Sequence, residues 1–464
     1  MPISELEASL LTQLQSINLN PDATIYVAFS GGLDSACLLH ALASLHNQTP
    51  FTQNIAVLHV HHGLSEHADD WLEFCEQQVK QYGFEFNAHK VVLSGQGSIE
   101  DQARESRYGV FENHLTPGDV LLMAHHSDDQ VETFMLRLMR GSGLTGLSAM
   151  DAKRNLAQGL LLRPWLNFSR KSLEQYKAQH IIQHIEDESN VDEMFDRNWW
   201  RNSLLPKLNT RFKHSHASIL KTIRILRQEN EVLQELLAPI YQNAVSHNLD
   251  GHGDYSSVGA GQKKRETLSV DALSGQSKNV CLQILRMWLA KQHVYPRLNE
   301  TQLTNVWAQV ALAKVDASPL FGWQGHEIRR YQNRLYVIDA LPAVDASKLK
   351  AQVFNGESLS LFAGELHCEN SAQGLKPDEY QLVFYQGGLK AKPVGQNTKS
   401  LKKWMMAHNI PPWIRPFWPV LLKDGQVACV PGLFVCEGFA PAILNEPSQD
   451  SAAATINTGW QLKI

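Results

Sequence analysis

A six-residue motif near the N-terminus joins an apolar segment to a helical pattern through two adjacent glycines. It consists of Ser30, Gly31, Gly32, Leu33, Asp34 and Ser35. Residues 24–29 before it are apolar and rich in strand formers, and residues 36–45 after it carry apolar side chains at helical spacing. A strand, a tight turn and a helix in this order direct backbone N–H groups and a helix N-terminus at one point, which suits a phosphate group. The motif is neither a Walker A loop nor a dinucleotide-binding turn. The alternative is an ordinary loop, because Ser-Gly-Gly by itself is common in loops.

Asp34 adds a second requirement to this turn. A carboxylate repels a phosphate unless a cation lies between them. We therefore expect Mg²⁺ beside Asp34, because Mg²⁺ binds through carboxylate and phosphate oxygens.

The first half of the chain alternates strand-like and helix-like segments. Strands are predicted at 24–29, 54–60, 84–93, 119–124 and 161–166, and helices at 36–45, 67–82, 98–114 and 127–140. This alternation predicts an α/β fold with a parallel sheet, in which ligands bind beyond the carboxyl ends of the strands. The polar residues that follow each strand are therefore candidates for a site.

A polar cluster follows the strand predicted at 119–124. Asp129 and Glu132 share one face of the next helix and would suit a ligand with an ammonium group. Two alternatives stay open, since acids in a first turn also complement the helix dipole and since a metal could bind here. The metal ligands would be His125, His126, Asp128 and Asp129, although the two adjacent histidines would point in different directions.

Two arginines share a face of the helix predicted at 98–114. Arg104 and Arg107 could bind a phosphate or stabilise charge in a transition state. The alternative is ordinary pairing with acids on the same helix, such as Glu100 with Arg104.

Composition limits the class of protein. The 464 residues are 43% apolar, enough for two to four domains. No signal peptide and no run of 18 apolar residues is found, which predicts a cytoplasmic protein without a membrane segment. The six cysteines include no CxxC pair, so buried, reduced thiols are expected.

Positive charge is concentrated in two stretches of an otherwise acidic chain. Residues 198–228 and 380–423 each contain seven Lys or Arg and no acid, whereas the whole chain has a net charge of −5. This pattern favours a protein that binds a polyanion at defined places. In the second stretch, aromatic residues such as Trp404 and Trp413 could stack on unpaired bases, but they are equally suited to a core.

Three domains are predicted. Residues 1–215 form the parallel-sheet, nucleotide-binding domain; residues 216–344 form a mainly helical domain with a flexible loop at 246–266; residues 345–464 form a small α+β domain.

The ordered motifs resemble those of the tRNA(Ile)-lysidine synthetases, a family of PP-loop ATP pyrophosphatases, in its long form with C-terminal domains. The motifs are SGGLDS, HVHHGLS, ARESRY, AHHSDDQVET, RGSGLTGL and LLRPWL, followed by RNWWRN and, near the C-terminus, an L-K-K and a P-P-W-x-R motif. The chain departs from the family pattern at the turn beginning at Lys390, where Lys392 and Gln396 replace arginines.

The resemblance implies a function and assigns the candidate residues. It implies ATP-dependent joining of free lysine to carbon 2 of the wobble cytidine of an isoleucine tRNA with a CAU anticodon, through an adenylylated cytidine. It does not decide whether the protein forms a homodimer. ATP would bind to residues 30–35 and His61, catalysis would use Asp34, Arg104 and Arg107, and lysine would bind to Asp129 and Glu132. The tRNA would contact Arg201, Lys207, Arg211, Arg224, Lys399, Lys402, Lys403 and Arg415.

Two rival functions remain at this point. A PP-loop tRNA thiolase would need a catalytic cysteine or a metal cluster, for which the lone Cys37 is poor support. A non-enzymatic RNA-binding protein should have lost part of the set Asp34, Arg104, Asp129 and Glu132, and none is missing. The sequence does not identify the base that removes a proton from the ammonium of lysine.

Overall fold

A computed structural model describes most of the chain, and it divides into two compact units, Met1–Gln234 and Glu235–Ile464. The described residues are 3–17, 19–63, 67–91, 99–188, 192–246, 265–292, 298–314, 317–341, 352–361, 364–371, 374–385, 387–440 and 459–463. Most of the loop predicted at 246–266 lies outside them. The predicted boundaries of three domains, at 215/216 and 344/345, remain a prediction. Within the described part of the chain, no helix is long and apolar enough to cross a membrane.

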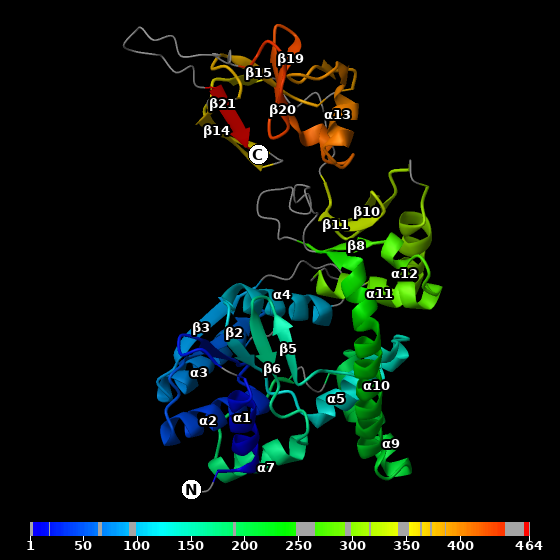
Figure 1. Cartoon of the computed structure of the whole chain (residues 1–464). Helices are drawn as coiled ribbons and strands as arrows, with labels where there is room; N and C mark the ends of the chain where they lie inside the picture. Colours follow the sequence, from blue (N-terminus) through cyan, green and yellow to red (C-terminus); the bar gives the residue numbers. More distant parts are fainter. Residues whose placement is uncertain are drawn as a thin grey trace. The chain divides into compact units, whose positions relative to one another are not determined.

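Unit 1 is built on a six-stranded sheet in the order β3-β2-β1-β4-β6-β5 (Figure 1). The strands are β1 (Thr24–Ala28), β2 (Asn54–His61), β3 (Glu85–Lys90), β4 (Val120–Leu122), β5 (Lys153–Leu156) and β6 (Gly159–Leu162). Neighbouring strands are parallel except β5, which pairs antiparallel with β6. The predicted α/β fold with a parallel sheet is confirmed. The strand predicted at 161–166 ends at Leu162, just before Pro164, whose nitrogen cannot donate to a ladder.

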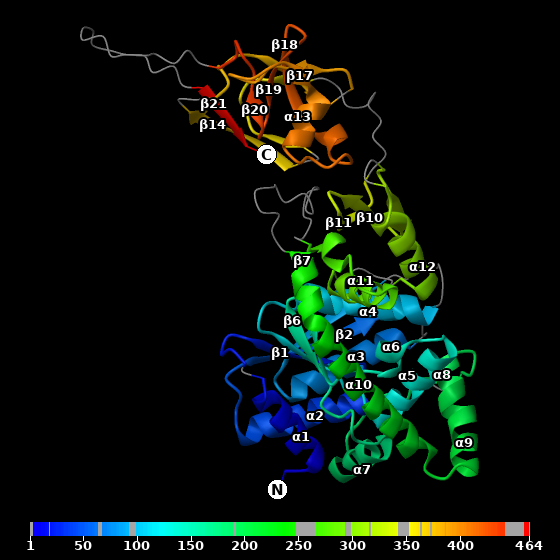
Figure 2. The same ribbon diagram turned by 45° about the vertical axis from the view of Figure 1, so that its right-hand side comes forward.

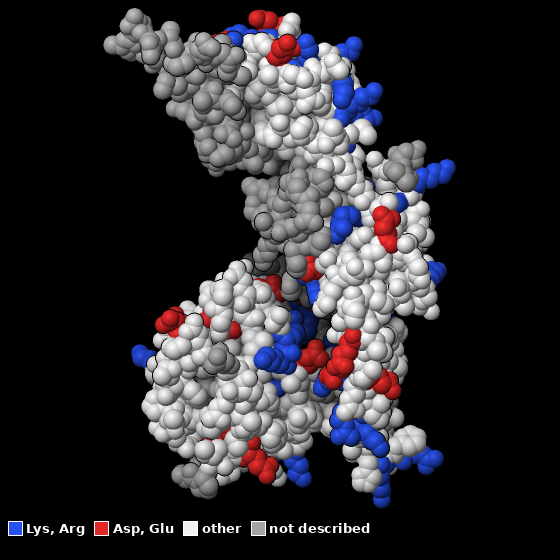
Figure 3. Space-filling view, in the orientation of Figure 1, with Lys and Arg blue, Asp and Glu red and all other residues white. Residues whose placement is uncertain are grey.

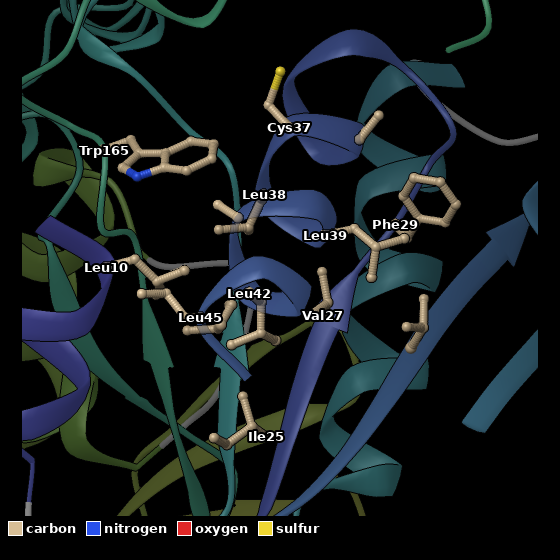
Figure 4. Packing of buried hydrophobic residues seen from close by; sticks show 14 of the residues in the cluster. Leu10, Ile25, Val27, Phe29, Cys37, Leu38, Leu39, Leu42, Leu45 and Trp165 are labelled. Carbon is tan, nitrogen blue, oxygen red and sulfur yellow. The ribbon is translucent and has the colours of Figure 1, made fainter. Parts of the chain in front are cut away.

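Helices cover both faces of this sheet. They are α1 (Glu5–Gln15), α2 (Leu33–Gln48), α3 (Ala68–Gln81), α4 (Ile99–His114), α5 (Ser127–Met139), α6 (Leu144–Leu147) and α7 (Arg170–His180). Alternate residues of β1 point to opposite faces, so Ile25 and Val27 pack with α1, α2, α3 and α7, and Tyr26 packs toward α4. Figure 4 shows Leu38 and Leu42 of α2 in the first of these cores, near Ile25 and Val27.

The strand order places a ligand crevice beside β1. The chain passes from β1 to β2 and β3 on one side, and β4, β6 and β5 lie on the other. Ligands of open α/β sheets bind at such a switch point, outside the carboxyl ends of the strands. The six-residue motif after β1 and the start of α5 after β4 both lie at this position.

The later part of unit 1 is helical. It contains α8 (Asp196–Trp199), a π-helix at Trp200–Leu204, α9 (Leu205–Arg211) and the start of α10 (Ser215–Ala244). Helix α10 packs beside α5 through Ile223 and Phe134 (Figure 2).

Unit 2 combines helices with antiparallel sheets. Its first part contains α11 (Lys278–Lys291) and α12 (Glu300–Asn305). It also holds a five-stranded sheet, β7-β8-β11-β10-β9, made of β7 (Val245–Ser246), β8 (Thr267–Ser269), β9 (Leu320–Trp323), β10 (His326–Tyr331) and β11 (Arg334–Asp339). The sequence of residues 321–339 predicts a hairpin with its turn at Gln332 and Asn333. This is confirmed, because β10 and β11 pair antiparallel and are joined at these two residues, which both have a positive φ.

The C-terminal part of unit 2 is α+β, as predicted. Its main sheet has the order β12-β15-β18-β19-β20, from β12 (Gln352–Phe354), β15 (Tyr380–Phe384), β18 (Pro419–Lys423), β19 (Gln426–Val430) and β20 (Phe434–Val435). Smaller sheets contain β13 (Leu359–Leu361), β14 (Gly364–Ser371) and β21 (Gly459–Lys463), and β16 (Lys390–Ala391) with β17 (Lys399–Ser400). Helix α13 (Leu401–Ala407) packs on this part through Leu401, Trp404 and Met405.

Candidate active site

The motif after β1 is a tight turn held against a distant segment of the chain. Gly31 has a φ of +83°, and its carbonyl accepts a hydrogen bond from the N–H of Ile185 at 2.9 Å. Gly32 is the N-cap residue just before α2, and no side chain caps the N–H groups at this end. The first turn of α2 therefore keeps backbone donors available for an anion.

The two serine hydroxyls lie on this turn. The Ser30 and Ser35 oxygens are 3.2 Å apart, and the Ser35 hydroxyl donates to the Gly32 carbonyl at 3.0 Å. Leu33 packs its side chain against the core, so it offers only its backbone to a ligand.

Gly31→Ala should destabilise the fold by about 2–4 kcal/mol, the sum of a left-handed backbone and a steric clash. A Cβ at this position would lie 2.5 Å from Ile185 Cδ1 and 2.9 Å from Cys75 Sγ. The matched control is Gly141→Ala, where φ is +69° but a Cβ meets open space. Denaturant unfolding should give only about 1 kcal/mol for the control, and equal losses for the two variants would contradict this account.

His126 connects the turn to the start of α5. Its side chain is 0% exposed, and its Nε2 lies 3.5 Å from an oxygen of Asp34 and 3.5 Å from an oxygen of Asp129. Its Nδ1 lies 3.4 Å from the Asp129 nitrogen, where it accepts a hydrogen bond from that N–H when the ring is neutral, and 3.6 Å from Asp128. The cap of α5 is thus His126, whereas Ser127 or Asp128 would be expected from residue preferences.

The charge of His126 depends on these carboxylates. Burial lowers the pKa of His126, but Asp34, Asp129 and Asp128 outweigh it, so the pKa is raised above its ordinary value. A raised pKa means that the protonated ring stabilises the folded state below the unfolded-state pKa of about 6.5, and that this stabilisation is lost as the pH rises through the folded-state pKa.

The stability difference between the natural protein and His126→Asn should therefore shrink as the pH rises above about 6.5, the ordinary pKa of histidine. The control is His67→Asn, because the His67 side chain is 55% exposed. Unfolding free energies measured across this range should show no such trend for the control. A His126→Asn difference that is constant or grows with pH would be the contrary result.

Asp129 and Glu132 form a buried ionic cluster with two arginines. Arg197 of α8 donates to Asp129 at 2.8 Å and to Glu132 at 2.7 Å. Arg201 in the π-helix donates twice to Glu132, at 2.7 and 3.1 Å. Glu132 is 1% exposed. Burial raises the pKa of Asp129, but Arg197, His126 and His125 have the opposite and larger effect, so the pKa lies well below the ordinary range.

The sequence analysis did not predict that Arg197 and Arg201 contact the acids of α5, and it assigned Arg201 to tRNA. The spacing of the two arginines was visible in the sequence, because both lie in the RNWWRN motif, four residues apart on one helical face. Their partners on α5 are more than 60 residues away in the sequence.

The other predicted residues of the site lie at the end of β2 and on α4. His61 ends β2, and its Nε2 lies 3.3 Å from Asp69 of α3. Arg104 and Arg107 lie on α4, where the Arg104 guanidinium covers the Tyr108 ring at 4.9 Å from its centroid.

A metal could be held at Asp34 but not by the histidine cluster. In the parts of the chain that the structure describes, no group of three His, Cys, Asp or Glu is arranged around a common point. The Oδ1 of Asp34 is buried and has no hydrogen-bond partner among the described residues. A carboxylate oxygen in this state fits a ligand to Mg²⁺ beside bound phosphates.

Comparison with known proteins assigns the family. A PP-loop domain model matches residues 4–208, a TilS substrate binding domain model matches residues 268–336, and a TilS substrate C-terminal domain model matches residues 380–447. The tRNA(Ile)-lysidine synthase of Vibrio parahaemolyticus is 35% identical over 90% of this chain and 93% of its own length. The chain belongs to the tRNA(Ile)-lysidine synthase family. The protein of the same name from Photobacterium profundum is 34% identical over 95% of this chain and 97% of its own length. The one from Salmonella typhi is 36% identical over 90% of this chain and 94% of its own length.

The cysteines of this family member are not placed for sulfur chemistry. The five described as free thiols, Cys37, Cys75, Cys281, Cys429 and Cys436, are buried. Burial raises the pKa of Cys37 to about 12. A thiol with such a pKa is not a nucleophile at neutral pH, which weighs against the thiolase alternative.

The basic residues expected to bind tRNA fall into two groups. Lys207, Arg211 and Arg224 in unit 1 and Lys399, Lys402 and Lys403 in unit 2 are exposed. Arg415 is different, since it is 6% exposed and both of its donating nitrogens bond to the Ile410 carbonyl. The nearby aromatic residues Trp404, Trp413, Phe417 and Trp418 are buried in the core, so they are not available to stack on bases.

Proposed function

We propose that this protein joins L-lysine to carbon 2 of the wobble cytidine of the isoleucine tRNA with a CAU anticodon, using ATP and releasing AMP and pyrophosphate. The observation that carries the proposal is the single cluster formed by Asp34, His126, Asp129 and Glu132. It joins a phosphate-binding turn directly to buried carboxylates. The names of the relatives and the two TilS domain models support the same reaction. A tRNA substrate would place this reaction in the cytoplasm.

The turn at residues 30–35 and the start of α2 would bind the phosphates of ATP. Backbone N–H groups at a helix N-terminus and two serine hydroxyls suit this role. Asp34 would hold Mg²⁺ through its unpaired Oδ1, and the ion would neutralise phosphate charge there. His126 would keep Asp34 in place, because its Nε2 lies within 3.5 Å of the carboxylate.

Two displacements complete the reaction. The cytidine carbonyl oxygen attacks the α-phosphorus, and pyrophosphate leaves as the new oxygen–phosphorus bond forms. The neutral ε-amine of lysine then attacks carbon 2, and AMP departs with that oxygen. Of the two arginines on α4, Arg107 would stabilise the charge that develops on the phosphoryl group.

The ionic cluster would bind lysine. Asp129 and Glu132 offer carboxylates for its ammonium groups, and Arg197 offers a guanidinium for its carboxylate. Because every oxygen of Glu132 already accepts from an arginine, lysine must exchange places with part of this network. The exposed residues Lys207, Arg211, Arg224, Lys399, Lys402 and Lys403 would contact tRNA phosphates.

Pyrophosphate release tests this function. ATP and Mg²⁺ are supplied with lysine and the isoleucine tRNA transcript, separately and together. We expect pyrophosphate only when RNA is present, and AMP only when lysine is present as well. Release of ADP and phosphate, or pyrophosphate release without RNA, would contradict the proposal.

A further inference from the structure

A second cluster of charge surrounds Tyr108, outside the network of Asp34, Asp129 and Glu132. The guanidinium carbons of Arg104 and Arg154 lie 4.9 and 5.2 Å from the centre of the Tyr108 ring. Arg104 is on the same helix, α4, and Arg154 comes from the edge strand β5. Two arginines from different elements therefore meet on one aromatic ring.

A third arginine reaches the hydroxyl end of the same ring. The Nη2 of Arg163, just after β6, donates to the Tyr108 oxygen at 3.4 Å. Its other donors go to His125 Nδ1 at 3.1 Å and to the Asp151 carbonyl at 2.8 Å. Arg163 is 2% exposed, and these three acceptors are a ring nitrogen, a backbone carbonyl and a hydroxyl. The buried guanidinium is therefore held by groups without a full negative charge.

No carboxylate balances this cluster among the side chains that the structure describes. In that set, which does not include the side chain of Glu100, Arg104, Arg154 and Arg163 form no ion pair with a carboxylate. By contrast, Arg197 and Arg201 are fully matched by acids. Burial raises the pKa of Tyr108, but the arginines Arg104, Arg163, Arg154 and Arg107 outweigh it and lower that pKa to about 8. An excess of positive charge at one place favours an anion.

The cluster is close to the proposed reaction but separate from the turn that binds ATP. Arg163 holds His125, whose chain neighbour His126 contacts Asp34. The turn follows β1, on one side of β4, whereas Arg163 and Arg154 come from β6 and β5 on its other side. Arg104 is exposed and Arg154 is half-buried, so an anion in solution can reach both. Figure 3 shows Lys and Arg side chains gathered on the face of unit 1 that carries α4 and β5.

We propose that Arg104 and Arg154, supported by Tyr108 and Arg163, bind a backbone phosphodiester of the RNA beside the cytidine that reacts. The inference rests on the proposed function for the identity of the RNA. The phosphates of ATP already have a site in the turn after β1, which leaves a phosphodiester as the anion that this second cluster meets. Arginine suits it, because a planar guanidinium can donate two hydrogen bonds to one phosphate.

The salt dependence of RNA binding tests the proposal. Fluorescence anisotropy of the labelled isoleucine tRNA transcript is measured over a range of salt concentrations, without ATP or lysine. Arg154→Gln should weaken binding about tenfold at low salt and lower the slope of log affinity against log salt by about 0.7 to 1. A tRNA of another sequence should lose the same amount, because phosphate contacts carry no sequence information.

Two controls make the result specific. Lys80→Gln removes one exposed positive charge from α3 in the same unit and should leave the slope unchanged. The KM for ATP in pyrophosphate release should also stay unchanged in Arg154→Gln. An unchanged RNA slope would overturn the proposal, as would a raised KM for ATP with normal RNA binding. Because the binding assay needs no chemistry, it reports on this cluster even if lysine transfer fails.

Discussion

Glu132→Gln should lower the free energy of unfolding by about 3–5 kcal/mol. Glu132 is 1% exposed, and its two oxygens accept hydrogen bonds from both Arg197 and Arg201. Gln keeps the volume of the side chain but removes its charge, so two partly buried guanidinium groups lose their main counter-charge. The same change should abolish lysine transfer if the cluster binds lysine.

A surface pair provides the control for this prediction. Glu174 lies 3.4 Å from Arg170 and its side chain is 53% exposed. Glu174→Gln should change stability by less than about 0.5 kcal/mol, because water screens an exposed pair. If chemical denaturation gave the two variants similar stabilities, the buried network would not hold α5 to the helix that carries Arg197.

Asp34→Asn should reduce pyrophosphate release by about 100- to 1,000-fold, the range seen when one preorganised electrostatic group is removed from a site. The amide can no longer offer a charged oxygen to Mg²⁺ beside the phosphates. The fold should tolerate the change, because the Asp34 side chain is 34% exposed.

Asp128→Asn is the matched variant for Asp34→Asn. Asp128 is also an acid near His126, at 3.6 Å, and is 37% exposed, but it lies at the start of α5. Steady-state rates of pyrophosphate release should fall less than about tenfold for this change. Equal losses for the two variants would mean that Asp34 acts only through the charge of His126.

The residues that sequence reasoning identified correctly share a local signal. The turn between β1 and α2 follows from a strand pattern, two glycines and a helix pattern within about 20 residues. The shared face of Asp129 and Glu132 follows from helical spacing. Each of these depends on neighbours in the sequence, and local geometry decides them.

The features that were missed depend on distant contacts. Nothing near Arg197 or Arg201 indicates that their partners are on α5, and nothing near Arg415 indicates that it is buried against the Ile410 carbonyl. The cluster at Tyr108 likewise needs α4, β5 and the residue after β6 to meet. The sheet of β7 to β11 was expected only as one hairpin, because two of its strands have three residues or fewer and short strands carry little pattern.

The most direct test of the account is the transfer of radiolabelled lysine to RNA. The isoleucine tRNA transcript is incubated with the protein, ATP, Mg²⁺ and labelled lysine, and the RNA is then isolated and counted. We predict that label enters the RNA, that it is lost when the wobble cytidine is changed to uridine, and that it is lost in Asp34→Asn. Pyrophosphate release without any label in the RNA would contradict the central claim and would indicate a different nucleophile.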